Sequence, residues 1–260
     1  MGKTIFVGAR KGGVGKTMTA ASLGFGLAKQ SKRVLLLDCD SQYSLTVSMG
    51  VREPDKLAAT LTSVLTDVIS DRDFEPTAGI LRHTEGVDFL PANSGLTGIE
   101  LALTQIIGRE SILRRYLDEV KSAYDYIIID TAPTLDLLTI NALAAADSVI
   151  IPVCPKFLDA LGLEQLLKAV AQIKRQINPS LSIGGILLTL VDRRANLTRE
   201  VIASIEQAYG RNIRIFGEHI PRSVKAAECS AQGVSIFTHD PNGKVAAAYN
   251  SLVEEVLRCG

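Results

Sequence analysis

The chain alternates between short apolar runs and longer segments in which apolar residues recur at helical spacing. Residues 33–37 (R-V-L-L-L) and 126–130 (Y-I-I-I-D) are almost continuously apolar, which is typical of strands that helices cover on both faces. The predicted strands span residues 5–7, 33–37, 87–90, 126–130, 148–153, 183–191 and 213–216. Most of them are therefore expected to be buried in a parallel sheet.

Helices are predicted between these strands. Within residues 110–123, apolar side chains repeat at helical spacing opposite charged ones, which is the pattern of an amphipathic helix. The predicted helices span residues 19–29, 56–69, 110–123, 158–177, 196–209 and 244–257. Strand and helix alternate without an internal repeat or a Pro/Gly/Ser-rich linker. We therefore expect an α/β fold with one doubly wound, mostly parallel sheet in a single domain of residues 1–260.

Composition narrows the class of protein. With 260 residues and 47% hydrophobic content, the chain can bury a substantial core without disulfides or metals. The four cysteines, Cys39, Cys154, Cys229 and Cys259, include no C-x-x-C pair, which argues against a zinc site or a disulfide framework. The N-terminus has the pattern of a strand and not of a signal peptide, and no apolar run is long enough to span a bilayer. We expect a cytoplasmic protein without a membrane partner.

Charge is balanced over the whole chain but not locally. Lys+Arg and Asp+Glu both number 28, so a nucleic-acid surface would have to be a local patch. Residues 172–225 carry an excess of basic side chains, namely Lys174, Arg175, Arg193, Arg194, Arg199, Arg211, Arg214, Arg222 and Lys225. Because few aromatic residues and no helix-turn-helix pattern accompany them, this stretch predicts sequence-independent contacts with a phosphate backbone. Solvated surface arginines are the alternative.

The strongest chemical signal is the stretch I-F-V-G-A-R-K-G-G-V-G-K-T at residues 5–17. A short strand leads into a loop containing Gly12, Gly13 and Gly15, and helix-forming sequence resumes at Thr17. The glycines let successive backbone N–H groups converge on one point. A concave set of amides at a helix N-terminus binds phosphate, so this loop predicts a phosphate site.

Two further residues complete this pattern. Lys16 would contact the β- and γ-phosphates, and the Thr17 hydroxyl would hold Mg²⁺. Arg10 stands where the strict P-loop pattern has its first glycine, and Lys11 adds a second lysine beside the loop glycines. A glycine-rich turn that binds nothing is the alternative interpretation.

Carboxylates end two of the predicted strands. Asp38 and Asp40 follow the strand at residues 33–37, and Asp130 ends the strand at residues 126–130. Open α/β sheets bind ligands at the carboxyl ends of their strands, and a strand that ends in Asp is the Walker B arrangement for Mg²⁺. Loop-capping or helix-capping aspartates are the alternative.

The loop K-G-G-V-G-K-T, with its additional Lys11, resembles the deviant Walker A loop of the ParA/MinD family of ATPases. Residues 187–201 (L-L-T-L-V-D-R-R-A-N-L-T-R-E-V) and 220–228 (I-P-R-S-V-K-A-A-E) are similar to ParA/Soj partition ATPases. The matching family segments read close to L-T-M-x-D-x-R-T-N-L and I-P-R-N-V-R-L-S-E. The resemblance covers essentially the whole chain and implies a P-loop NTPase fold, a three-layer sandwich.

The resemblance also implies roles for individual residues. ATP would be bound by Lys11, Gly12, Gly13, Val14, Gly15, Lys16, Thr17 and Met18, with Pro221 and Arg222 bordering the adenine. Thr17, Asp38 and Asp130 would lie at Mg²⁺. Lys11, Lys16 and Asp40 would be the catalytic residues, with Lys11 reaching phosphates of the partner subunit and Asp40 orienting the attacking water. DNA would be contacted by Arg193, Arg194, Arg222 and Lys225.

Several positions depart from the family pattern. Ser41 stands where the family usually has Pro, Ala132 replaces a second Pro, and Asp136 replaces Gly. Lys225 replaces a common Arg, which keeps the charge but loses bidentate geometry. None of these changes removes a phosphate ligand. They bear on the geometry around the γ-phosphate, and with it on the rate of hydrolysis.

The function expected from the resemblance is ATP-dependent DNA partition of a plasmid or chromosome. An ATP-bound homodimer would bind non-specific DNA at the nucleoid, and a ParB-type centromere-binding partner would stimulate hydrolysis. A related ATPase that positions a protein cargo is one alternative, and a metabolic ligase of the same fold is another. A MinD-like membrane regulator is less favoured, because residues 244–257 carry Glu254 and Glu255 instead of a basic amphipathic pattern.

Overall fold

The computed structural model describes residues 2–192 and 194–258. Its strands are β1 (Lys3–Val7), β2 (Val34–Cys39), β3 (Leu81–Arg82), β4 (Asp88–Leu90), β5 (Tyr126–Thr131), β6 (Ser148–Val153) and β7 (Ser182–Leu188). Within the described ranges these seven strands form one sheet in the order β3-β4-β2-β5-β1-β6-β7. Among the described pairs, β3–β4 alone is antiparallel. The predicted doubly wound, mostly parallel sheet is confirmed.

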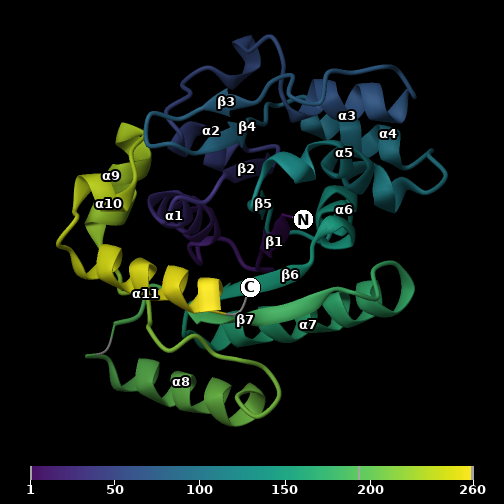
Figure 1. Cartoon of the computed structure of the whole chain (residues 1–260). Coiled ribbons are helices and arrows are strands. Elements are labelled where there is room, and N and C mark those ends of the chain that lie inside the picture. Colours follow the sequence, from purple (N-terminus) through teal and green to yellow (C-terminus); the bar gives the residue numbers. More distant parts are fainter. Residues whose placement is uncertain (1, 193, 259–260) are drawn as a thin grey trace.

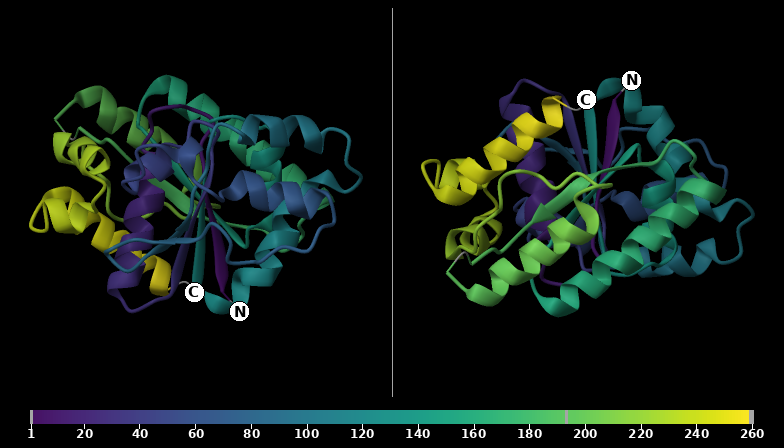
Figure 2. Two further views of the ribbon diagram at one scale, coloured as in Figure 1. Left: turned by 90° about the horizontal axis from the view of Figure 1, so that it is seen from above. Right: turned by 90° about the horizontal axis from the view of Figure 1, so that it is seen from below.

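Helices cover both faces of this sheet (Figures 1 and 2). They are α1 (Lys16–Lys29), α2 (Ser44–Ser48), α3 (Leu61–Ile69), α4 (Leu96–Leu103), α5 (Ile112–Val120), α6 (Leu137–Ala145), α7 (Phe157–Gln176), α8 (Asn196–Tyr209), α9 (Val224–Gln232), α10 (Ile236–His239) and α11 (Lys244–Arg258). Figure 2 also shows that the end of α11 lies close to the start of β1.

Alternating side chains of the strands divide the core into two halves. Leu35 and Leu37 of β2 belong to a cluster with α3, α4, α5, α6 and α7. Val34 and Leu36 belong to a second cluster with α1, α2, α10 and α11. All four side chains are at most 1% exposed. Burial of apolar surface on both faces is the main term that stabilises the three layers, and it explains the continuously apolar strands.

Parallel pairing brings the chemical residues together. β5 lies between β1 and β2, with Asp130 paired to Val7 on one side and to Asp38 on the other. The loop after β1 and the acids after β2 therefore meet at the carboxyl end of the sheet.

Two predictions about secondary structure were wrong. The helix expected over residues 56–69 begins only at Leu61, because Thr60 is its N-cap and the Ser63 side chain accepts from the Thr60 N–H at 2.9 Å. The strand expected over residues 213–216 is a single bridge between Ile215 and Ile186. After it, the Leu188 carbonyl accepts from the Ile220 N–H at 2.9 Å, so residues 217–219 leave the ladder with β7, and the Gly217 N–H donates to the Glu255 side chain at 3.0 Å.

Other limits shifted. The strand expected over residues 183–191 ends at Leu188, since Leu190 has a left-handed φ of 53°. The helix expected over residues 110–123 is α5 flanked by 3₁₀ turns at Arg109–Ser111 and Lys121–Ala123. The sequence pattern did not predict β3, α2, α4, α6, α9 or α10.

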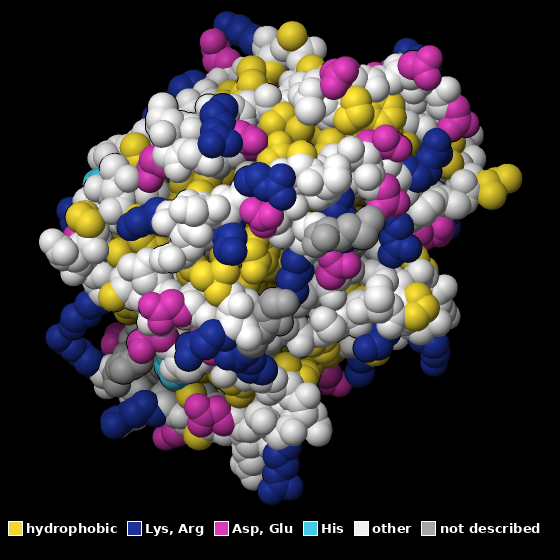
Figure 3. All heavy atoms as spheres, viewed as in Figure 1, with side chains coloured by type: hydrophobic (Ala, Val, Ile, Leu, Met, Phe, Trp, Pro, Cys, Tyr) yellow, Lys and Arg dark blue, Asp and Glu magenta, His cyan; other side chains and the backbone are white. Residues whose placement is uncertain are grey.

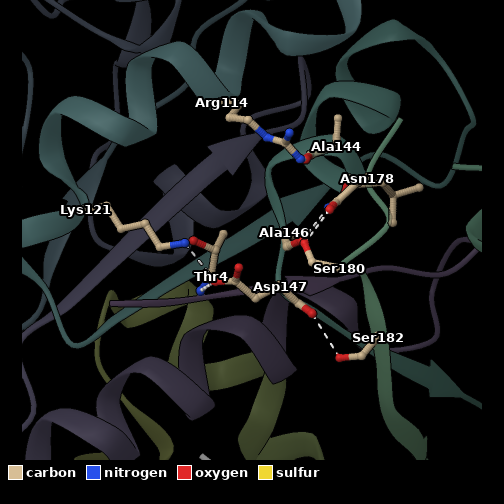
Figure 4. Close-up of polar contacts among 10 residues, drawn as sticks. Thr4, Arg114, Lys121, Ala144, Ala146, Asp147, Asn178, Ser180 and Ser182 are labelled. Carbon is tan, nitrogen blue, oxygen red and sulfur yellow. Dashed lines mark hydrogen bonds and ion pairs between the residues drawn. The ribbon is translucent and has the colours of Figure 1, made fainter. Parts of the chain in front are cut away.

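A polar network holds the opposite end of the sheet (Figure 4). The Asp147 carboxylate, between α6 and β6, accepts from the Thr4 N–H at 2.7 Å and from Lys121 Nζ at 2.9 Å. Ser182 donates its N–H at 3.1 Å and its hydroxyl at 2.9 Å to the Asp147 carbonyl. One residue thus joins β1, β7 and the end of α5.

Asn178, between α7 and β7, gives a prediction about stability. Its buried Nδ2 donates to the carbonyls of Leu143 at 3.2 Å and Ala146 at 2.7 Å, which end α6. Asn178→Ala leaves these carbonyls without that donor and should lower the free energy of unfolding by about 1–3 kcal/mol. Urea denaturation measures the change. Ser180→Ala removes only an exposed hydroxyl that donates to Asn178 and should change stability by less than about 0.5 kcal/mol.

Candidate nucleotide-binding site

The loop between β1 and α1 forms an open cradle. Gly13 and Gly15 have left-handed φ values of 73° and 82°, which side chains other than glycine rarely adopt. A Cβ atom added to Gly12 or Gly13 would meet no atom within 4 Å, so space lies directly in front of the loop. α1 begins at Lys16 without a side-chain cap. Its first N–H groups are thus available to an anion.

The loop is also anchored to the segment that follows the edge strand β7. Thr189, just after β7, is 1% exposed and donates its hydroxyl to the Val14 carbonyl at 2.7 Å. Val14 is itself buried. The cradle therefore rests on β7 as well as on β1, which holds its backbone in place without a side chain entering the open space.

The two lysines of the loop have different surroundings. Lys16 is 8% exposed, and burial lowers its pKa, while the Asp130 and Asp40 carboxylates act in the opposite direction. Lys11 is exposed to solvent. Lys16 therefore points its charge into the site of its own subunit, whereas the Lys11 side chain is available to another molecule.

Asp130 has the properties of a cation ligand. It is 1% exposed, its Oδ2 accepts from the Thr17 hydroxyl at 2.7 Å, and its Oδ1 is buried without a hydrogen-bond partner. Burial, followed by the neighbouring Asp38, raises the pKa of Asp130 to about 8. A divalent cation would satisfy the free oxygen and favour the ionised carboxylate, so Thr17 and Asp130 fit Mg²⁺.

Thr17 and Asp130 lie at the open glycine loop. Mg²⁺ is usually held by one or two carboxylates together with waters and substrate phosphates. The arrangement therefore suits a Mg²⁺ that arrives with a phosphate ligand.

Asp38 is occupied by the protein itself. Its Oδ1 accepts from the Asp40 N–H at 3.1 Å, and its Oδ2 accepts from the N–H and hydroxyl of Thr46, each at 2.7 Å. Burial raises the pKa of Asp38 to about 6 against these bonds. The geometry gives Asp38 a positioning role for the segment after β2, and its role at Mg²⁺ stays a prediction.

Asp40 lies at the mouth of this cluster. It is 8% exposed, and its Oδ1 accepts from the Gln42 N–H at 2.9 Å. Its other oxygen therefore has capacity for a water molecule. The Tyr43 N–H donates to the Asp40 carbonyl at 2.8 Å, so the backbone around Asp40 is fixed on both sides.

Two acids that the sequence analysis did not assign to the site also lie here. Asp136 is the N-cap of α6 and accepts from the Thr139 N–H at 2.8 Å, which accounts for an acid at a position where the family has Gly. An Asp before an apolar run is an N-cap signal that could have revealed it. Burial, with Asp136 and Asp40, raises the pKa of half-buried Glu100 to about 7, which places α4 beside the site. No local pattern signals Glu100.

The remaining predicted residues divide between two places. Arg194, Pro221 and Arg222 line a cavity of about 590 Å³ between the end of β7 and α11, and a bridge joins Val191 to Pro221. Met18 is a half-buried residue of α1. Lys225 lies on α9, outside this lining, and its Nζ is 3.4 Å from the Glu228 carboxylate. Arg193 lies outside the described residues.

Basic and acidic side chains are mixed on the surface. On the face in Figure 3, Lys and Arg lie among Asp and Glu over all of the visible elements. This pattern agrees with the equal totals of 28 basic and 28 acidic residues. In the part of the chain that the structure describes, no helix is long and apolar enough to cross a membrane.

The buried Asp130 predicts an unusual dependence of stability on pH. The pKa of an Asp in an unfolded chain is near 4, whereas burial raises the pKa of Asp130 in the folded protein to about 8. Between these values the folded state binds more protons, so the free energy of unfolding falls as the pH rises. In nucleotide-free protein with EDTA, Asp130→Asn should therefore raise Tm at pH 8 more than at pH 5, by at least about 2 °C.

The control is Asp125, a half-buried acid whose pKa is lowered to about 2 by the hydrogen bonds from Arg33. Its folded and unfolded pKa values both lie below 5, so Asp125→Asn should shift Tm equally at pH 5 and pH 8. A Tm shift for Asp130→Asn that is the same at both pH values would contradict a raised pKa.

Comparison with known proteins places this site in a family. The family model described as an AAA domain matches residues 2–183. The chain is 41% identical over 262 residues to the sporulation initiation inhibitor protein Soj of Bacillus subtilis (strain 168), covering 100% of both chains. It is 37% identical over 260 residues to the chromosome partitioning protein ParA of Myxococcus xanthus (strain DK1622), covering 99% of this chain and 89% of the relative.

Two solved structures of similar fold carry names other than Soj or ParA. One is cobyrinic acid a,c-diamide synthase from Mycobacterium smegmatis with bound ADP and magnesium, with a TM-score of 0.85, 36% identity, and coverage of 99% of this chain and 95% of that one. The other is apo McdA, with a TM-score of 0.86, 25% identity, and coverage of 98% and 100%. Taken with the full-length similarity to Soj and ParA, the loop K-G-G-V-G-K-T and the buried Asp130 show that the chain belongs to the ParA/Soj-type partition ATPases of the ParA/MinD deviant Walker A family.

Proposed function

We propose that this protein is an ATPase that partitions DNA, and that residues 1–260 act as one domain. The observation that carries the proposal is the open phosphate cradle beside Lys16, Thr17 and Asp130, in a chain that is 41% identical to Soj over its whole length. ATP and Mg²⁺ are the cofactors. A solved relative of the same fold holds an ATP analogue and magnesium.

The loop and its flanking residues bind the triphosphate. The N–H groups at the start of α1 and the Lys16 ammonium neutralise the β- and γ-phosphates, and Val14 keeps the loop in place through Thr189. Thr17 and Asp130 are the residues that would hold Mg²⁺. When bound, this ion neutralises charge that develops on the phosphate oxygens.

Hydrolysis requires a positioned water. Asp40 supplies a carboxylate that orients it, and Asp38 fixes Asp40 through the 3.1 Å bond to its N–H. Exposed Lys11 donates to the phosphates of the other subunit in an ATP-bound homodimer. Each active site is thereby completed only when two subunits meet.

DNA binding is assigned to the basic residues beside the cavity and on α9. Arg194, Arg222 and Lys225 are all exposed and would contact phosphates without reading bases. Pro221 and Arg222 border the adenine. A ParB-type partner stimulates hydrolysis and releases the dimer from the nucleoid in the cytoplasm.

Two other functions are tied to particular neighbours. The similarity to cobyrinic acid a,c-diamide synthase favours an ATP-dependent amide-forming ligase, and the similarity to McdA favours a positioning ATPase. DNA binding separates the first from partition. A ligase has no need to bind DNA when ATP is present and to release it with ADP.

The two lysines should fail differently. Lys16→Ala should lose nucleotide binding, because its buried ammonium meets the phosphates within one subunit. Lys11→Ala should keep nucleotide affinity within about threefold but lose the ATP-dependent dimer and its turnover. Fluorescent-nucleotide titration and analytical ultracentrifugation with ATP measure both properties. Arg10→Ala, beside Lys11, is the control and should dimerise as wild type does. A normal dimer of Lys11→Ala would contradict the role across the interface.

Arg194 and Lys225 test DNA binding. Wild type should bind unrelated duplexes with ATP and not with ADP, and log affinity should fall with log salt by about 0.9 per neutralised phosphate. Arg194→Glu with Lys225→Glu should abolish this binding while ATP-dependent dimerisation stays intact. The control is Lys56→Glu with Arg72→Glu. It changes the net charge by the same amount, at exposed positions that are distant in sequence from Arg194 and Lys225. Equal loss in both double variants, or strong preference for one sequence, would overturn the assignment.

A further inference from the structure

The short helix α2 is tied firmly to the strand end that carries Asp38 and Asp40. Thr46 of α2 is 0% exposed and donates both its N–H and its hydroxyl to Asp38 at 2.7 Å. The same hydroxyl accepts from the Ala92 N–H at 2.9 Å, at the end of β4. α2 therefore cannot move independently of the residues beside the nucleotide site.

The other end of α2 is in direct contact with α9, and Figure 1 shows the two helices near one another on one side of the molecule. Gly50, with φ of 92°, follows α2, and Gly233, with φ of 69°, is the C-cap of α9. A Cβ atom on Gly233 would lie only 2.6 Å from Gly50 Cα. Arg52 also donates its Nη2 to the Ala231 carbonyl at the end of α9. Gly50 and Gly233 thus meet backbone to backbone, and the Arg52 side chain adds a hydrogen bond across the same contact.

α9 is held at this contact and by α10, whose His239 side chain hydrogen-bonds Glu228 at 2.9 Å and Gln232 at 3.2 Å. Within its described residues, Cys229 is the one side chain that is buried. Beyond its C-terminal end, His83 donates Nε2–H to the Gly233 carbonyl at 3.1 Å, and Glu85 accepts from the Ser235 N–H at 2.8 Å. Lys225 lies at the opposite, exposed end of the helix. A small shift at Gly233 would therefore change the position of Lys225.

We propose that α2, through the contacts of Gly50 and Arg52 with the end of α9, transmits the nucleotide state of one subunit to Lys225. A change at Asp40 on binding ATP moves α2, and α2 displaces the end of α9. Dimerisation adds a second DNA surface but is not the sole switch. The inference rests on the proposed DNA function of Lys225, and linkage requires that DNA in turn changes the affinity for nucleotide by the same factor.

Hydrogen exchange of the α9 amides tests this relay without DNA. Wild type, saturated with a non-hydrolysable ATP analogue or with ADP, should show a difference in exchange over residues 224–233. Arg52→Ala should lose at least half of that difference while nucleotide affinity and dimerisation stay within about twofold. Arg52 is exposed, so this variant is expected to fold. Lys56→Ala removes an exposed cation that pairs only with Glu53 in the described structure and should respond as wild type does.

The outcomes separate the relay from the proposed function. An α9 that exchanges equally with both nucleotides, or an Arg52→Ala variant that dimerises and responds fully, would overturn the relay. In the second case the protection would come from the dimer interface. An α9 that responds in wild type and loses its response in Arg52→Ala supports the relay even if no DNA binds. That combination would instead refute DNA binding by Lys225.

Discussion

Three buried ionisable side chains at the carboxyl end of the sheet constrain the rest of the site. Asp38 and Asp130 are register partners on β2 and β5, both 1% exposed, and Lys16 is the nearby cation. Ionising both carboxyls beside one ammonium would leave a negative excess in a region of low dielectric. That cost raises the pKa of Asp130 to about 8, and a further cation would remove it. The open glycine loop beside them accepts an anion. A triphosphate that arrives with Mg²⁺ satisfies both demands together.

Asp38 and Asp130 differ in their hydrogen-bond partners, and this difference separates their roles. The hydrogen bonds of Asp38 go to Asp40 and Thr46, whereas Asp130 keeps one oxygen without a partner. Sequence patterns treat both as acids after a strand. Only the position of Thr46, eight residues after Asp38 and folded back on it, distinguishes the one that organises the loop from the one left open to a cation.

The elements that could be predicted from the sequence are those that apolar burial stabilises. The bounds of strands such as β6 and helices such as α8 were predicted to the residue. A strand buried on both faces has a continuous apolar run, and a helix buried along one side has apolar residues at helical spacing. The expected strand at 213–216 is only a bridge, because the next carbonyl of β7, that of Leu188, accepts from the Ile220 N–H and residues 217–219 leave the ladder. α2 and α9 were missed since one is short and the other buries a single side chain. The phosphate loop and Asp130 were recognised because backbone geometry and metal chemistry restrict the residue types there. Glu100 reaches the site only through tertiary packing.

The two helices with the weakest sequence patterns, α2 and α9, are also the ones that link the nucleotide site to Lys225 in the proposed relay. A helix with one buried residue contributes little apolar burial, and its position then depends on a few contacts at its end. For α9 these contacts include those with Gly50, Arg52, His83 and His239. For the proposed DNA function, the equal totals of basic and acidic residues make such control useful, since the net charge alone supplies no attraction to DNA. Under the proposed DNA function, binding by a protein of balanced charge depends on the placement of a few cations, and a shift of α9 would alter that placement.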